Sequence, residues 1–290
     1  MRTAYAKYLV ALLLFGLNGI VAAQIALSSY ETVFWRTLIG AAMLTAILVA
    51  SRKGFAFPKP GRSLAFLAAG GVSMGASWAF LYEAYQQVGV SVATLEYYLG
   101  PVLMMLVSPL LFREKLTWVK LAGFAVVLAG LMLVNGGSLA HGGSVWGLAC
   151  GALAALGLAS QVICNKLATG ITGLANATGQ LVAAFATVAV FTAVKTGFAV
   201  SFPSADWLPM LLLGVVNTGA GCYFYYSSIG RLPIQSVAVI GYLEPLAAVV
   251  FSVLLLHETM TAPMAVGGAL ILGGAIFGET VRSKARQRAD

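Results

Sequence analysis

The sequence predicts an all-α integral membrane protein with ten transmembrane helices, arranged as two inverted five-helix repeats. Three observations lead to this prediction. Apolar residues make up 60% of the 290 residues and charged residues only 9%, with a mean hydropathy of +0.92, whereas about 25% of the residues of a soluble domain are charged. Ten apolar stretches have the length of a membrane span. The two halves of the chain also share a pattern of residues at one constant spacing.

This composition excludes a cytosolic enzyme, a nucleic-acid-binding protein and a secreted disulfide-rich domain. The three cysteines, Cys150, Cys164 and Cys222, each lie in an apolar stretch, and their odd number favours packing roles over a disulfide framework. We expect no cofactor and no metal.

The spans follow from the length of each apolar stretch, since a helix needs about 20 apolar residues to cross the hydrocarbon. The first stretch starts with basic residues as a signal peptide does, but its long apolar run favours a retained helix. Short links separate the stretches, several of them rich in Gly, Ser or Pro, such as the one from Asn135 to Ser144. The predicted spans are residues 8–27, 31–51, 63–84, 90–112, 117–134, 145–166, 174–195, 206–229, 234–256 and 262–279.

The distribution of Lys and Arg predicts the orientation. With the N-terminus in the cytoplasm, every Lys and Arg falls on the cytoplasmic side except Lys195, which is outside, and Arg36, which is within a span. We therefore expect a multi-pass protein of the cytoplasmic (inner) membrane with both termini in the cytoplasm. The net charge of +8 then reflects topology, and the basic C-terminal tail suits anionic lipid.

An internal repeat appears when the sequence is shifted against itself by 144 residues. We assign the repeats to residues 1–138 and 139–290. Each holds five predicted spans, and because five is odd the second repeat enters the membrane inverted. Inverted repeats with interrupted helices are typical of secondary transporters. The shift brings Tyr98-Leu99-Gly100-Pro101 onto Tyr242-Leu243-Glu244-Pro245, Glu114 onto Glu258, Gly123 onto Gly267 and Gly130 onto Gly274.

These features resemble the EamA-like branch of the drug/metabolite transporter superfamily. The resemblance rests on the repeated five-span unit, the Tyr-Leu-Glu-Pro at 242–245 and the Glu258 that closes the same helix. The first repeat departs from the pattern with Gly100 in place of the glutamate. The resemblance implies a ten-helix carrier with a central substrate cavity for small metabolites such as amino acids, nucleosides or quaternary amines.

Arg36 is the first candidate for the substrate site. An ionisable group within a span costs about 2.5–3.5 kcal/mol on insertion scales and marks a site or a relay by default. A guanidinium can bind a carboxylate through two hydrogen bonds, which suits an amino-acid substrate. The alternative is a structural partner for Glu31 or Glu96, although Glu31 is five residues away and poorly placed for a pair on one helix face.

Glu96 is the second candidate, as the substrate or proton site. It stands next to Tyr97 and five residues before Pro101. Because proline lacks an N–H, the helix is interrupted there and carbonyl groups are freed. A carboxylate, free carbonyls and aromatic rings suit an ammonium group. The alternative for Glu96 is an interhelical hydrogen bond.

Glu244 lies near the middle of the ninth span, directly before Pro245. Desolvation disfavours the charged form of a carboxylate, so Glu244 suits proton coupling. Helix bending or gating by the Glu-Pro pair, as for Pro101, is the other interpretation. The remaining residues predicted to line the substrate site are Trp78, Tyr82, Tyr97, Tyr242, Asn18 and Gln24.

The predicted function is secondary active transport of a small polar metabolite, an amino acid or related zwitterion, by alternating access, coupled to protons or working by exchange. A carrier of choline-like quaternary amines is the alternative within this class. A membrane-embedded enzyme is the alternative from another class, but the chain offers no convergent set of catalytic groups. The expected partners are the substrate, the lipid bilayer and protons as the coupling ion, with no nucleic acid, in a monomer or homodimer.

Overall fold

The computed structural model describes residues 2–51, 61–112, 118–140, 142–197, 206–229, 232 and 240–286. Regular secondary structure in these ranges is helical throughout. Within the described residues, seven helical segments are long and apolar enough to cross a membrane, and two shorter apolar helices accompany them at Leu243–Leu255 and Ala262–Phe277. The chain is thus an all-α multi-pass membrane protein, as predicted, while the count of ten spans stays a prediction.

The helices follow the predicted spans in order. Residues 234–239 of the predicted ninth span, and Glu114, lie outside the described residues. The helices are α1 (Arg2–Gly16), α2 (Asn18–Ala22), α3 (Ser29–Ala50), α4 (Arg62–Val88), α5 (Val90–Tyr97), α6 (Leu99–Phe112), α7 (Trp118–Ala140), α8 (Val145–Leu167), α9 (Gly173–Thr196), α10 (Trp207–Leu211), the π-helix η2 (Leu212–Ala220), α11 (Gly221–Ile229), α13 (Leu243–Leu255) and α14 (Ala262–Arg286).

Two spans are interrupted at equivalent positions of the two repeats. The fourth is broken at Tyr98, between α5 and α6, and the ninth has a turn residue at Tyr242, before α13. Pro101 and Pro245 each follow the break by three residues. In the first turn of the new helix the missing N–H of a proline costs no intrahelical hydrogen bond. The prolines thus fix where each span restarts.

The eighth span contains the π-helical segment η2 between α10 and α11. Within it, the hydroxyl of Thr218 donates to the carbonyl oxygen of Leu213, five residues earlier, at 2.8 Å. η2 packs against α3, where a Cβ at Gly40 would lie 2.7 Å from Thr218 Cγ2. Long π-helical segments are rare and frequently occur at functional sites. This one brings Thr218 to α3 near Arg36.

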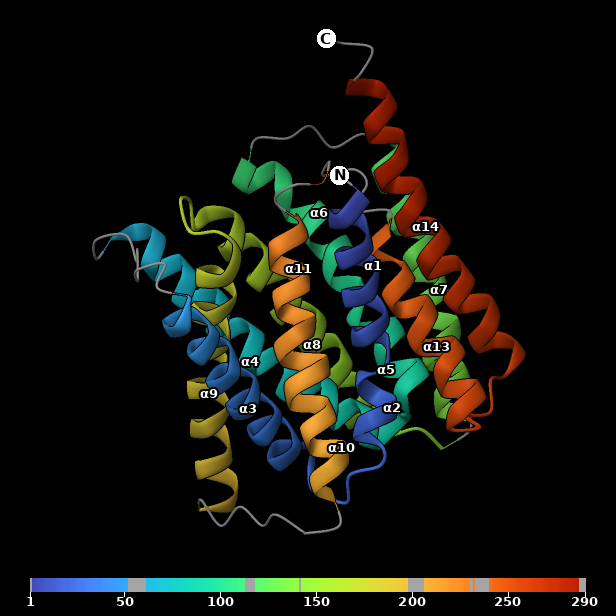
Figure 1. Cartoon of the computed structure of the whole chain (residues 1–290). Helices are drawn as coiled ribbons and strands as arrows, with labels where there is room; N and C mark the ends of the chain where they lie inside the picture. The colour runs from blue at the N-terminus through green and yellow to red at the C-terminus, as the bar shows by residue number, and fades with distance from the viewer. Residues whose placement is uncertain are drawn as a thin grey trace.

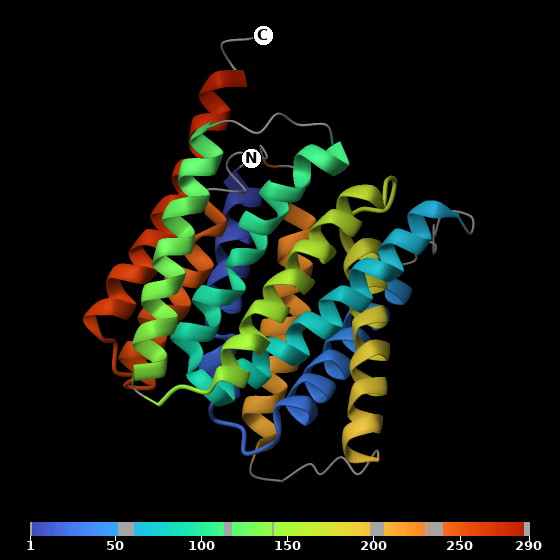
Figure 2. The same cartoon turned by 180° about the vertical axis from the view of Figure 1, so that it is seen from behind.

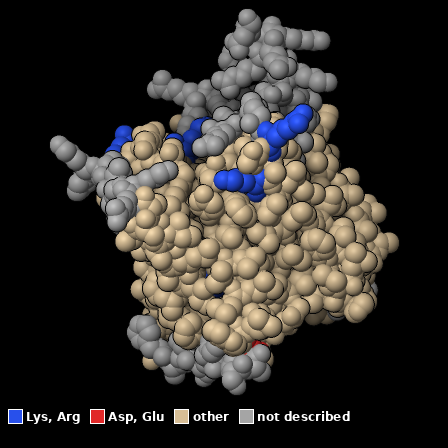
Figure 3. Space-filling model, viewed as in Figure 1, with Lys and Arg blue, Asp and Glu red and all other residues tan. Residues whose placement is uncertain are grey.

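The helices form a bundle with two flanks. α7 and α14 lie side by side along one flank and α9 lies on the opposite one, with α1, α5, α8 and α11 between them (Figures 1 and 2). The start of α1 and the end of α14 lie at the same end of the molecule (Figure 1). On the face in Figure 3, Lys and Arg gather towards that end, above a broad and mostly uncharged belt.

Glycine residues form the contact between α7 and α14. A Cβ at Gly130 would lie 2.6 Å from the carbonyl oxygen of Gly267, and one at Gly267 would lie 2.5 Å from that of Gly130. A Cβ at Gly274 would lie 2.9 Å from the carbonyl oxygen of Gly123. Small residues let membrane helices approach this closely. The last helices of the two predicted repeats therefore meet backbone to backbone, and we call these four glycines the glycine seam.

Candidate functional site

Arg36 lies two turns into α3 and is only 1% exposed. Its Nε donates to the Thr218 hydroxyl of η2 at 3.0 Å, and its Nη1 donates to the Tyr82 hydroxyl of α4. The third nitrogen, Nη2, is buried without a hydrogen-bond partner. An unsatisfied buried donor on a charged group is costly. The guanidinium is therefore held on two sides and open to one further acceptor.

Aromatic rings form the surface on which this guanidinium rests. Its Cζ lies 4.4 Å from the centre of the Trp78 ring and 4.9 Å from that of Tyr82. The two residues are four apart on α4, so they share one face of the helix. Cation–π attraction compensates part of the buried charge and keeps the guanidinium in place.

No carboxylate pairs with Arg36 among the described residues. Glu31 instead closes a capping box at the start of α3, where it accepts from the Ser28 hydroxyl at 2.7 Å. Glu96 interacts with the side chain of Asn135 on α7. The hydrogen bonds of Arg36 therefore go to Thr218 and Tyr82, and these contacts of Glu31 and Glu96 lie elsewhere.

Glu244 is the carboxylate that is electrostatically coupled to Arg36. It lies half-buried in the first turn of α13, and its carboxyl group interacts with the side chain of Tyr98. The charge of Arg36 acts on it, and Tyr97 and Tyr225 are within electrostatic range as well. A cation from one half of the chain and an acid from the other thus share one aromatic interior.

Glu96 occupies a different place. It is 1% exposed and lies against Gly151 of α8, where any added Cβ would overlap its Oε2. Its neighbour Tyr97 belongs to the aromatic interior instead, with its ring 5.7 Å from that of Tyr98. The structure therefore does not bring Glu96 together with Arg36.

The other predicted lining residues divide between interior and surface. Tyr242 is buried, with its ring 6.4 Å from that of Tyr98. Asn18 is half-buried at the start of α2, and its Oδ1 has no hydrogen-bond partner. Gln24 is exposed in the turn after α2 and does not join the buried group. The residues that gather around the aromatic interior are Arg36, Trp78, Tyr82, Tyr97, Tyr98, Tyr225, Tyr242 and Glu244.

Sequence reasoning missed two partners of the buried charges, Thr218 and Asn135. Neither carries a charge, so neither stands out in an apolar span. Asn135 was also assigned to the link after the fifth span, whereas α7 continues to Ala140. That assignment was wrong.

A chain of amide side chains between α8 and α9 was also missed. Asn165 Oδ1 accepts from Asn176 Nδ2 and Gln180 Nε2, both at 2.8 Å. Gln161 Nε2 donates to Gln180 Oε1 at 3.4 Å and to the Tyr226 hydroxyl of α11 at 3.2 Å. The spacing of four residues within each amide pair, 161 with 165 and 176 with 180, is the signal that could have found this network.

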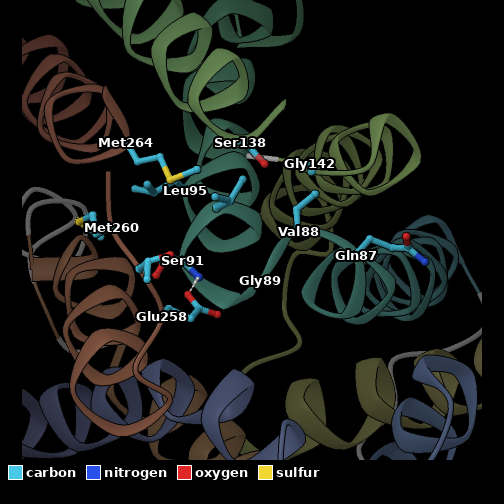
Figure 4. A pocket seen from close by; sticks show the side chains of 13 residues that line it. Gln87, Val88, Gly89, Ser91, Leu95, Ser138, Gly142, Glu258, Met260 and Met264 are labelled. Carbon is cyan, nitrogen blue, oxygen red and sulfur yellow. Dashed lines mark hydrogen bonds between the residues drawn. The ribbon is translucent and has the colours of Figure 1, made fainter. Parts of the chain in front are cut away.

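Glu258 connects the second half of the chain to the start of α5. Its Oε1 accepts from the Val90 N–H at 2.6 Å and its Oε2 from the Ser91 N–H at 3.0 Å. An acidic side chain at a helix N-terminus satisfies free N–H groups and complements the helix dipole. Beside it lies a pocket of about 260 Å³, also lined by Leu95 and Ser138 (Figure 4).

An apolar helical bundle with interrupted spans and buried charges is typical of membrane transport proteins. The sequence model of the EamA-like transporter family matches residues 3–136 and again residues 145–278. The chain belongs to this family, within the drug/metabolite transporter superfamily.

Relatives of the chain bear transporter names. It is 25% identical to "Uncharacterized transporter YxxF" of Bacillus subtilis, over 86% of this chain and 80% of the relative. It is 27% identical to "Probable terminal-alkyne amino-acid exporter" of Streptantibioticus cattleyicolor, over 72% and 70%. It is 28% identical to "Aromatic amino acid exporter YddG" of Ancylobacter novellus, over 68% and 69%. A solved crystal structure shares the fold with a TM-score of 0.68 at 22% identity, over 96% of this chain and 98% of its own.

Proposed function

We propose that the protein is a secondary active transporter that carries an amino acid or a related zwitterion across the cytoplasmic membrane by alternating access. The observation that carries this proposal is the buried Nη2 of Arg36, which has no hydrogen-bond partner. Two relatives named as amino-acid exporters support the same substrate class.

The substrate carboxylate accepts from Nη2 of Arg36. Arginine suits this role because its planar fork of donors matches the geometry of a carboxylate. Thr218 and Tyr82 already hold the other two nitrogens, so the free N–H groups are fixed in direction before the substrate arrives. This preorganisation lowers the entropic cost of binding.

The substrate ammonium lies towards Glu244, whose carboxyl group interacts with the side chain of Tyr98. A zwitterion bridging Arg36 and Glu244 neutralises both buried charges, whereas an anion or a cation neutralises one. The rings of Trp78 and Tyr97 then surround its side chain with apolar and π surface.

Alternating access follows from two inverted repeats, residues 1–138 and 139–290. The glycine seam supports this division, because Gly123 with Gly274 and Gly130 with Gly267 are related by exchange of the halves. The equivalent breaks at Tyr98 and Tyr242 support it too, since interrupted helices line the sites of such carriers. The basic end of the molecule, where α1 begins and α14 ends (Figure 3), supports cytoplasmic termini.

A ligand-stabilisation assay on the detergent-purified protein tests the proposal, because a ligand that binds the folded state raises its melting temperature. The probes are L-phenylalanine, its methyl ester, which lacks the carboxylate, its N-acetyl derivative, which lacks the ammonium group, and choline. We expect stabilisation by the free amino acid alone. The shift should vanish in Arg36→Ala, remain weakened in Arg36→Lys and shrink in Glu244→Gln.

Melting temperatures without ligand show whether each variant folds. Equal stabilisation by the methyl ester, or a full shift in Arg36→Ala, would contradict the carboxylate clamp. Stabilisation by choline that Arg36→Lys keeps and Glu244→Gln loses would favour the quaternary-amine carrier instead.

A further inference from the structure

The side chain of Glu96 has an incomplete set of hydrogen bonds. Its carboxyl group interacts with the side chain of Asn135, yet its Oε2 is buried with no partner. Oδ1 of Asn135 is buried and unpartnered as well. Two helices, α5 and α7, thus present one orphaned oxygen each in the same buried contact.

A single proton resolves both deficits. An ionised carboxylate only accepts hydrogen bonds, and an amide has donors on its nitrogen and an acceptor on its oxygen. The Asn135 nitrogen can therefore donate to Glu96, but its oxygen has nothing to accept from a carboxylate. When Glu96 is protonated, its O–H donates to Asn135 Oδ1, and acid and amide exchange two hydrogen bonds.

The described residues around Glu96 offer no positive charge in place of that proton. Among the described residues, the Cys150 thiol on α8 interacts electrostatically with Glu96 and also with Glu83 on α4. Two further acids lie near α5: Glu258 at its N-terminus and Glu244 of α13, which acts on Tyr97. With the described residues as its surroundings, an ionised Glu96 would be buried near the Cys150 thiol with no counter-ion, which is strongly unfavourable.

We propose that Glu96 is a proton-binding site of the carrier, separate from the substrate site, and that it holds the proton as a carboxylic acid–amide pair with Asn135. Its role in coupling rests on the proposed transport function, whereas its protonation does not. Binding moves one proton from water to the carboxylate, forming an O–H bond at Glu96, and release returns it.

The pocket beside Glu258 supplies the route for this proton. It lies where α5 begins and α7 ends, at the end of the molecule away from the termini. Its lining includes Leu95, the neighbour of Glu96, and Ser138, one turn beyond Asn135 (Figure 4). The recess therefore follows the same two helices that hold the acid–amide pair. We therefore expect protons to reach Glu96 from that face, where Leu95 lines the pocket.

Infrared spectroscopy of the purified protein at neutral pH tests protonation without a substrate. We expect the carbonyl stretching band of a protonated carboxyl group in the wild type and in Glu244→Gln, and its loss in Glu96→Gln. Glu96→Gln keeps the fold because glutamine makes the same two hydrogen bonds to Asn135. In Asn135→Ala the band should shift, since the acid loses its partner. A wild type without the band, or a band lost in Glu244→Gln and kept in Glu96→Gln, overturns the proposal.

Proteoliposomes test coupling. An imposed pH gradient should accelerate L-phenylalanine flux in the wild type, whereas Glu96→Gln should lose this response and keep exchange of labelled for unlabelled L-phenylalanine. An unchanged pH response in Glu96→Gln contradicts the coupling role. Absence of L-phenylalanine binding with the infrared band intact would remove the proposed function and leave the proton site standing.

Discussion

The carboxylate of Glu258 accepts the backbone N–H of Ser91 at 3.0 Å, although 167 residues separate the two in the chain. The same contact is reinforced by the hydroxyls of Ser91 and Ser252, which lie 2.5 Å apart. The N-terminus of α5, in the first half, is thus tied to the link between α13 and α14 in the second half. A helix cap normally comes from the adjoining residue, so this one also fixes tertiary structure.

Replacing Glu258 by Gln should destabilise the protein by about 1 kcal/mol, because the amide nitrogen would face a backbone N–H and the charge that complements the helix dipole is lost. Denaturant unfolding in detergent measures the change. Glu31→Gln is the matched control, since glutamine also completes a capping box and should leave stability nearly unchanged. Equal effects of the two substitutions would contradict a special role for Glu258.

Gly89→Ala should cost more than Gly173→Ala. Both glycines have positive φ, +82° and +61° respectively, and a side chain in the left-handed region costs about 1–2 kcal/mol. At Gly173 nothing lies within 4 Å of the added Cβ, whereas at Gly89 it would lie 2.9 Å from Glu258 Oε1. The difference between their melting temperatures contains this contact together with the greater backbone strain at Gly89, whose ψ of +165° lies outside the left-handed helical region. It should shrink when Glu258 is replaced by alanine in both backgrounds.

The glycine seam predicts a large effect at Gly130. An added methyl would lie 2.6 Å from the Gly267 carbonyl oxygen, and because backbone cannot move aside like a side chain, α7 and α14 must separate. We expect Gly130→Ala to destabilise by about 1–3 kcal/mol. Gly136→Ala, on the same helix with nothing within 4 Å, should be neutral or stabilising. Thermal unfolding of both variants distinguishes packing from helix propensity.

Thr218→Val should unfold more easily than the wild type by about 1–3 kcal/mol, because the substitution keeps the shape but leaves Nε of Arg36 buried and unpaired. Thr37→Val, one residue from Arg36, removes a hydroxyl that donates to the Val33 carbonyl oxygen at 2.7 Å within α3. It should have a small effect, since the Val33 carbonyl oxygen also accepts a backbone hydrogen bond of the helix and stays satisfied. Similar losses in both variants would mean that Thr218 does not support the guanidinium.

Much of the fold could be predicted because the signals are strong and local. Apolar stretches identify most helices, and Pro101 and Pro245 locate the breaks at Tyr98 and Tyr242. The end of α7 was missed because Asn135, Gly136 and Gly137 have the composition of a turn. There the helix continues against α14, where a Cβ at Gly137 would lie 3.2 Å from Met264 Cγ, and tertiary packing overrides local propensity.

The site was harder to predict. The charges of Arg36 and Glu244 are conspicuous in apolar spans, and the structure couples the two electrostatically as candidate members of one site. Their neutral partners were not predictable, because a threonine in a span carries no signal and Thr218 lies 182 residues from Arg36. Glu96 shows the opposite case, since its chain neighbour Tyr97 faces the aromatic interior while the acid itself faces α7 and α8.

In the glycine seam, glycines from equivalent positions of the two halves occupy the same helix–helix contact. Gly123 and Gly267 are equivalent, as are Gly130 and Gly274, each pair 144 residues apart. In the structure Gly123 contacts Gly274, and Gly130 contacts Gly267. A larger residue at one of these positions of α7 would clash with α14 and would require a compensating change there. Substitutions on the two helices are therefore not independent. A complete mutational scan should therefore show similar tolerance to substitution at positions of α7 and α14 that are 144 residues apart, because the same close packing constrains both helices.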